Sequence, residues 1–216
     1  MIVPVLSVLS ETYPEVQLTI LSRAFFKPFF NDFSNVVFLE ADVNQKHKGF
    51  MGVLKLAEEA NAIGINAVAD LHNVIRSKII TRYLKIFGKK TATLNKGRKE
   101  KKSLTRKKNK YFKQLKTTHQ RYADVFETLG FPIELTNFTP LPKKEYNKNI
   151  LSLVGKKKKS IIGIAPFAAY KGKMYPLELI KKAIEELDKQ YQIVLFGGGT
   201  KEITQLDTFE NEFNSV

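Results

Sequence analysis

The chain has 216 residues, of which 43% are hydrophobic, including 16 Phe and 8 Tyr, and it carries a net charge of +15. This hydrophobic content suffices for a folded core and excludes global disorder, while the absence of cysteine excludes disulfides, thiolate catalysis and cysteine-bound zinc. Because no uncharged apolar run approaches the roughly 18 residues of a membrane span and the start lacks a basic leader, the sequence predicts a cytoplasmic protein without a transmembrane segment.

Apolar patterning predicts alternating helices and strands through the first 129 residues. Helices are expected at 3–12, 25–30, 50–63, 75–87 and 118–129, and strands at 16–21, 36–39, 67–71 and 91–94. Gly130 is expected to end the last helix, because glycine readily adopts the left-handed conformation that follows many helices. Strands that alternate with helices favour a parallel sheet covered on both faces, so the sequence predicts an α/β, doubly wound fold.

Most of the positive charge lies in one segment, residues 89–116. This segment holds 13 Lys or Arg and one acid, Glu100, and therefore accounts for +12 of the net charge. Such a segment attracts nucleic acid, an anionic membrane surface or a phosphorylated glycolipid; the alternative is a solvated charged flap without a partner. Only Tyr111 and Phe112 could stack on bases there, so a nucleic-acid partner is not expected.

The last part of the chain repeats the strand–helix–strand pattern. An apolar run at 161–164 predicts a strand, which a charged loop connects to a helix with Pro176 in its first turn. A second apolar run at 192–196 predicts another strand and is followed by three glycines, 197–199. A lysine in the charged loop, at the carboxyl end of a strand and beside a helix start, is well placed for the phosphates of a nucleotide.

Three motifs of this chain resemble those of one enzyme family. Residues 166–176, PFAAYKGKMYP, carry the pattern Pro-x-Ala-x-x-x-x-Lys-x-aromatic-Pro, and residues 70–77, DLHNVIRS, carry Asp-x-x-x-x-x-Arg-Ser after a predicted strand. Residues 3–14 combine a Val-Pro-Val-Leu helix start with a Tyr-Pro pair before the next strand. In this order the motifs resemble the ADP-heptose:lipopolysaccharide heptosyltransferases, glycosyltransferase family 9.

The resemblance implies a GT-B fold, with two Rossmann-like, doubly wound domains. The expected parts are an N-terminal acceptor-side domain at 1–140, a basic linker at 141–159, and the first half of a C-terminal nucleotide-sugar domain at 160–216. Pro140, Pro142 and the lysine run 156–159 suit a linker between domains.

The resemblance also implies that the chain is truncated at both ends. In the family, a strand and a Gly-Asp turn precede the first helix, and the aspartate of that turn is the expected catalytic base, which here would lie before Met1. A later Asp-Ser/Thr-Gly-x-x-His stretch of the family is absent as well. The first domain is therefore expected to lack its first strand and the second to be incomplete, which predicts a marginally stable, catalytically silent chain.

By the resemblance, the function is the inverting, metal-independent transfer of a heptose-like sugar. The donor would be a nucleotide-sugar, ADP-linked, which is a substrate, so no cofactor is expected. The acceptor would be an anionic glycolipid of the lipopolysaccharide-core type at the inner face of the cytoplasmic membrane. The alternative hypothesis is a noncatalytic α/β protein that binds an anionic glycolipid or nucleic acid.

The donor-side residues follow from the first motif. By the resemblance, Lys173 contacts the diphosphate of the donor; the alternative is an ordinary surface lysine. Four residues are expected beside it in the donor-side loops: Pro166, Ala168, Gly197 and Gly198. Phe167 and Ala169 stand where the family often has Gly and Ser, which removes a hydroxyl donor to phosphate.

The acceptor-side residues follow a strand end, where α/β proteins form their sites. Asp70 is expected to act as a carboxylate near the acceptor and is the weaker candidate for the base; the alternative is a structural acid that caps a turn. His72 and Arg76 are expected on the same side, with Arg76 binding anionic groups of the acceptor. Because His47, His72 and His119 are scattered, no metal site is expected.

Overall fold

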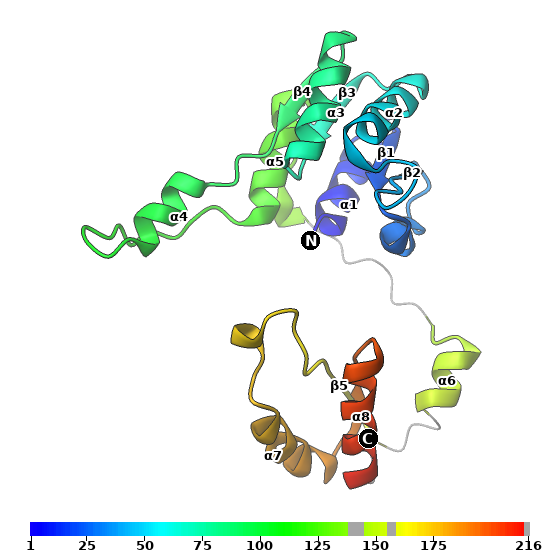
Figure 1. Cartoon of the computed structure of the whole chain (residues 1–216), viewed down its shortest axis with the longest axis vertical. Coiled ribbons are helices and arrows are strands. Elements are labelled where there is room, and N and C mark those ends of the chain that lie inside the picture. Colours follow the sequence, from blue (N-terminus) through cyan, green and yellow to red (C-terminus); the bar gives the residue numbers. More distant parts are fainter. Residues whose placement is uncertain (138–144, 155–158, 214–216) are drawn as a thin grey trace. The chain divides into compact units, whose positions relative to one another are not determined.

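The computed structural model of the chain describes residues 1–137, 145–154 and 159–213. The chain divides into two compact units, Met1–Pro142 and Lys143–Val216 (Figure 1). Part of the predicted linker, including Pro140, Pro142 and the lysines at 156–158, lies outside the described residues. The described part of that range contains helix α6 (Lys148–Val154), which the sequence did not predict.

The first unit contains every helix and strand predicted for it, with bounds that differ by no more than two residues. Its strands are β1 (Leu18–Ser22), β2 (Val36–Glu40), β3 (Ala67–Asp70) and β4 (Lys90–Thr93). Its helices are α1 (Val3–Thr12), the 3-10 helix η1 (Ala24–Phe30), α2 (Gly49–Ala62), α3 (Ile75–Ile86), α4 (Arg98–Thr105), α5 (Thr118–Leu129) and the 3-10 helix η2 (Leu135–Asn137). Helix α4 lies in the basic segment and was not predicted.

Local sequence signals explain where these helices begin and end. Pro4 lies in the first turn of α1, where the missing N–H of proline costs no hydrogen bond. Thr117 caps α5 by accepting a hydrogen bond from the N–H of Gln120 at 3.1 Å. Gly130 ends α5 with a φ of 101°, as predicted.

Helices cover both faces of the strands in the first unit, which confirms a mixed α/β architecture. On one face, α2 and α3 pack against each other and against Leu21, Leu39 and Val68. On the other face, α1 and α5 pack against Ile20 and Phe38 of the first strand pair. The core is therefore two apolar layers, one on each side of the strands.

The strands of this unit form two parallel pairs, β1 with β2 and β3 with β4. The N–H of Leu18 donates to Asn35 on the β2 side, and the N–H of Lys90 in β4 donates to the carbonyl of Asn66 just before β3. Because successive residues of a strand direct their backbone groups to alternate edges, the far edges carry those of Thr19 and Leu21 in β1 and of Ala67 and Ala69 in β3. Within the described residues no strand pairing joins β1 to β3.

The second unit contains one parallel strand pair, β5 (Ile161–Ile164) with β6 (Gln192–Leu195). In addition to α6 it has the helices α7 (Leu177–Asp188) and α8 (Thr200–Glu212). Its core joins Ile184 of α7, Ile193 of β6 and Phe209 of α8, each no more than 2% exposed. Pro176 lies just before α7, at its cap position, rather than inside the first turn as predicted. The turn Lys171–Lys173 forms the 3-10 helix η3.

Candidate functional site

The donor-side loops leave the same edge of the second unit, because β5 and β6 are neighbouring parallel strands. Phe167 in the first loop lies against Gly197 in the second. A Cβ added at Gly197 would lie 3.1 Å from the Phe167 ring and 2.9 Å from Leu206 of α8. A side chain at 197 would therefore have to push aside Phe167 and Leu206, which pack closely on this glycine.

Lys173 is the last residue of η3, and its side chain is exposed. Its N–H donates to the carbonyl of Tyr170 at 2.8 Å, and its Nζ lies 5.5 Å from the centroid of the Tyr170 ring. Among the described residues no acid forms an ion pair with Lys173, so its charge is available to an anionic ligand. In the segment that leads from β5 to this turn, Pro166 is buried and Ala168 half-buried.

The glycine turn before α8 already has a partner for one of its backbone donors. The N–H of Gly198 donates to Oε2 of Glu202 at 2.9 Å, and Gly199 has a φ of 80° that favours glycine. The Glu202 carboxylate lies in the first turn of α8, where the helix dipole stabilises negative charge. A phosphate could bind the N–H of Gly198 only by displacing this carboxylate.

On the acceptor side, Asp70 is the buried residue that organises the loop after β3; it is 5% exposed. Its Oδ1 accepts hydrogen bonds from the backbone N–H groups of His72 at 3.0 Å and Asn73 at 2.7 Å. Asn73 has a φ of 46°, and its Nδ2 donates to the carbonyl of Leu94 at 2.7 Å. Oδ1 therefore holds a turn, while Oδ2 is buried without a hydrogen-bond partner in the described structure.

The structure brings Asp70, His72 and Asn73 together through backbone hydrogen bonds, and it leaves the side chains of His72 and Arg76 exposed. Arg76 lies in the first turn of α3, and within the described residues it forms no ion pair with Asp70. Its charge is therefore directed to solvent and is available to an anionic ligand.

The sequence pattern of glycosyltransferase family 9 (heptosyltransferase) matches residues 53–215, which is most of the chain. The chain belongs to this family. The match contains both the Asp70 loop and the Lys173 loop and favours the glycosyltransferase hypothesis over the noncatalytic alternative. The third motif, at residues 3–14, lies outside the matched range.

Solved structures show that the chain has the fold of this family. It is similar to the glycosyl transferase family 9 protein from Veillonella parvula DSM 2008, with 18% identity and a TM-score of 0.73, over 99% of this chain and 63% of that one. It is also similar to the E. coli heptosyltransferase WaaC with ADP, with 14% identity and a TM-score of 0.65, over 99% of this chain and 68% of that one. The chain thus spans about 63% of the length of the Veillonella protein. A comparison with curated protein sequences gives no significant match.

Arg121 is a buried residue of α5 whose structural importance the sequence analysis missed. It lies on α5, is only 6% exposed, and pairs with Glu100 of α4 at 2.6 Å. Its Nη1 donates to the carbonyl of Asn95 at 3.2 Å and its Nε to that of Lys116 at 3.3 Å. The signal in the sequence was an arginine four residues before the buried Val125, and so on the apolar face of the helix.

His47 is a buried residue of the first unit that contacts both Asp42 and Glu59. It is 2% exposed; its Nδ1 accepts from the N–H of Asp42 at 3.0 Å, and its Nε2 lies 3.3 Å from Glu59. The hydrogen bond from Lys46 to Glu59, helped by His47 and opposed by burial, lowers the pKa of the Glu59 carboxyl. No cluster of three potential metal ligands occurs in the described part of the chain, and no helix there is long and apolar enough to cross a membrane.

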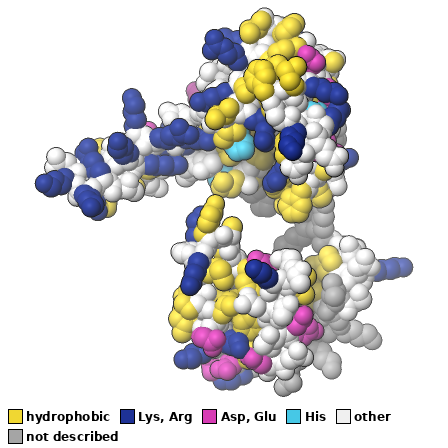
Figure 2. Space-filling view, viewed as in Figure 1, with side chains coloured by type: hydrophobic (Ala, Val, Ile, Leu, Met, Phe, Trp, Pro, Cys, Tyr) yellow, Lys and Arg dark blue, Asp and Glu magenta, His cyan; other side chains and the backbone are white. Residues whose placement is uncertain are grey.

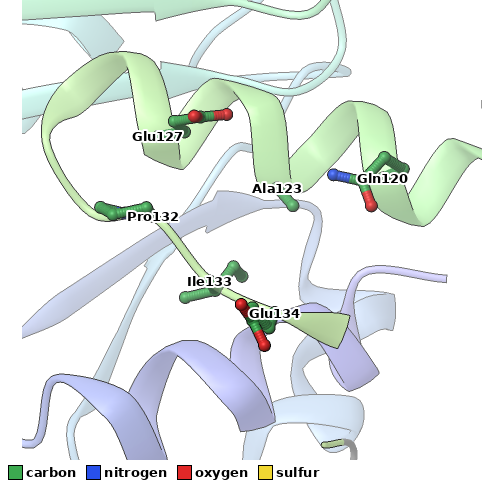
Figure 3. A pocket seen from close by; sticks show the side chains of 6 residues that line it. All are labelled: Gln120, Ala123, Glu127, Pro132, Ile133 and Glu134. Atoms are coloured by element: carbon green, nitrogen blue, oxygen red, sulfur yellow. The ribbon is translucent and has the colours of Figure 1, made fainter. Parts of the chain in front are cut away.

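A pocket of about 390 Å³ lies between α5 and the segment that follows it (Figure 3). Its lining residues are Gln120, Ala123, Glu127, Pro132, Ile133 and Glu134. The two carboxylates make it unsuited to a phosphorylated ligand, because like charges repel. It is therefore assigned neither to the donor nor to the acceptor.

Proposed function

We propose that the chain serves in the transfer of a heptose-like sugar from an ADP-linked nucleotide-sugar to an acceptor of the lipopolysaccharide-core type. The family match supports sugar transfer, and the similar E. coli heptosyltransferase structure contains ADP. The observation that carries the proposal is the charge of Lys173, with which no acid among the described residues pairs, on a loop at the shared edge of β5 and β6. Nucleotides bind at such edges in α/β folds.

In this proposal Lys173 acts on the leaving group. As the bond between the sugar and the diphosphate breaks, negative charge develops on the diphosphate oxygens, and an ammonium held nearby stabilises that charge. Phe167, packed on Gly197, keeps the loop close to the glycine turn. The nucleoside diphosphate then leaves as the acceptor hydroxyl attacks the opposite face of the anomeric carbon, which inverts its configuration.

A base must take the proton of the acceptor hydroxyl. The resemblance assigns that step to the aspartate of the family's Gly-Asp turn. Within the chain Asp70 is the candidate, and only its Oδ2 is unengaged, because Oδ1 holds the turn at His72 and Asn73. Its hydrogen bonds equally support the structural role.

The acceptor side of the proposal is the first unit. Exposed Arg76 would bind a phosphate or carboxylate of the glycolipid, since a guanidinium offers several N–H donors in one plane. His72 lies on the same loop and would donate a further hydrogen bond. An anionic glycolipid of this kind places the reaction at the inner face of the cytoplasmic membrane.

The test is a competition among nucleotide-sugars for the chain, measured by calorimetry or ligand-observed NMR. The proposal predicts that an ADP-sugar binds and that UDP- and GDP-sugars compete poorly. Preference for a UDP- or GDP-sugar would contradict the ADP-linked donor. Absence of binding by every nucleotide-sugar, with the chain shown to be folded by circular dichroism, would contradict the donor site.

A further inference from the structure

Most of the basic segment projects from the first unit as an arm, while its first residues form β4 and pack in the core. Helix α4 has no buried residue, and residues 96–116, here called the cationic arm, extend away from the rest of the first unit (Figure 1). The returning chain is held to α4, since the N–H of Tyr111 donates to the carbonyl of Ser103 at 3.1 Å. Arg106 closes the end of the arm with a hydrogen bond from its Nε to the carbonyl of Asn109.

The root of the arm is fixed to the body by the buried Arg121. This side chain binds Asn95 before the arm, Glu100 on α4, and the carbonyl of Lys116 at the end of the arm. Gly97 passes so close that a Cβ there would lie 2.4 Å from Arg121 Nη2, and its φ of 60° also favours glycine. Arg121 therefore fixes both ends of the arm to the rest of the first unit.

Nearly all the charged side chains on the surface of the arm are Lys or Arg (Figure 2). Its single acid, Glu100, is paired with Arg121, and Lys116 is paired with Asp124 at 2.6 Å. The other arm cations have no acidic partner among the described residues: Lys96, Arg98, Lys99, Lys101, Lys102, Arg106, Lys107, Lys108, Lys110 and Lys113. This surface thus attracts a polyanion over a distance set by the ionic strength.

Two aromatic side chains lie beside these cations. Phe112 is 79% exposed and Tyr111 60% exposed, and Nζ of Lys110 lies 6.0 Å from the Phe112 ring. An exposed aromatic pair next to lysines is unfavourable in water but suits the boundary between lipid headgroups and acyl chains, where rings insert and ammonium groups stay at the surface. Proteins that bind single-stranded nucleic acid commonly space aromatic rings along the strand to stack on successive bases, whereas the two rings here are adjacent in sequence.

We propose that the cationic arm docks the protein on an anionic phospholipid bilayer, with its lysines on the headgroups and Phe112 and Tyr111 inserted at the interface. This binding does not depend on the sugar transfer proposed above, because it needs neither donor nor acceptor. Each cation near an anionic surface changes affinity about fivefold, so neutralising or reversing five of them lowers it by about 10³-fold or more.

The experiment uses the absence of tryptophan from the chain. Phe112→Trp places a single fluorescent reporter on the arm, and Phe25→Trp, at a 78% exposed position on η1, is the matched control on the body. Both are mixed with phosphatidylcholine vesicles containing 30% phosphatidylglycerol or none. The proposal predicts sedimentation with the anionic vesicles only, and a blue shift of emission for Phe112→Trp but not for Phe25→Trp.

Charge variants test the electrostatic part. The arm variant reverses Lys99, Lys101, Lys102, Lys107 and Lys108 to Glu. The control variant reverses five exposed lysines outside the arm: Lys27, Lys55, Lys78, Lys85 and Lys182. Circular dichroism establishes that both are folded. Vesicle affinity should fall about 10³-fold or more for the arm variant and only severalfold for the control, and 0.5 M NaCl should release the unmodified chain.

Several results would overturn the proposal. Equal losses of vesicle affinity in the two charge variants would show that net charge, and not the arm, drives binding. Vesicle binding without an emission shift at position 112 would contradict the insertion of the aromatic side chains. Binding to micelles of a phosphorylated glycolipid but not to phosphatidylglycerol vesicles would make the arm an acceptor contact. If RNA displaces the chain from vesicles at equal concentrations of phosphate, the arm binds nucleic acid rather than the bilayer.

Discussion

Substitution of Asp70 separates its structural role from a role of its charge. In Asp70→Ala, the backbone N–H groups of His72 and Asn73 lose their shared acceptor. Hydrogen bonds to a charged group contribute about 1.5–3 kcal/mol each, and because these two share one oxygen we expect a combined loss of about 2–4 kcal/mol. In Asp70→Asn the Oδ1 acceptor is kept, so the free energy of unfolding should fall by less than it does in Asp70→Ala.

The assay is urea unfolding followed by circular dichroism, with the midpoint shift converted through the slope of the transition. Asp70→Asn is the matched control, and it is also the variant in which acceptor binding or transfer can be tested on a folded chain. If Asp70→Ala unfolds at the same urea concentration as the unmodified chain, the turn does not depend on this carboxylate. If the free energy of unfolding falls as much in Asp70→Asn as in Asp70→Ala, the charge rather than the acceptor geometry stabilises the loop.

Two further predictions concern the first unit. Backbone amides on the far edges of the strand pairs, such as Leu21 and Ala69, should exchange with deuterium faster than the paired amide of Leu18, as measured by NMR; equal protection would mean that a further strand pairs with those edges. Because the Lys46 hydrogen bond lowers the pKa of Glu59 in the folded state, Glu59 stabilises the fold above the unfolded value of 4.5, and that contribution is lost as the pH falls below it. Urea unfolding should therefore show that Glu59→Gln is less stable than the unmodified chain at pH 7. The difference in their free energies of unfolding should become smaller below pH 4.5, and a difference that grows there would contradict the stabilising role of the Glu59 charge.

The regular elements of the first unit could be predicted because each buries an apolar face with a helix or strand period. The same reasoning failed for α4, which has no buried residue and so carries no apolar period to detect. It also gave no prediction for α8, in which Phe209 alone is buried. In such helices, local propensity and tertiary contacts decide the structure.

The candidate site was predictable only as far as residue type and strand ends allow. The position of Lys173 in a loop after a strand followed from the apolar pattern. The root formed by Arg121 did not, since its bonds to Asn95 and Glu100 join segments that only the fold brings near.

The donor site is the central claim, and titration of ADP into the folded chain by calorimetry tests it most directly. Lys173→Ala is compared with Lys171→Ala, which removes an equally exposed lysine from the same 3-10 turn. Loss of a charge-assisted hydrogen bond costs about 1.5–3 kcal/mol, so we expect Lys173→Ala to weaken ADP binding by roughly ten- to a hundredfold and Lys171→Ala by less than about threefold. Unchanged ADP affinity in Lys173→Ala, or equal losses in both variants, would contradict the assignment of Lys173 to the diphosphate.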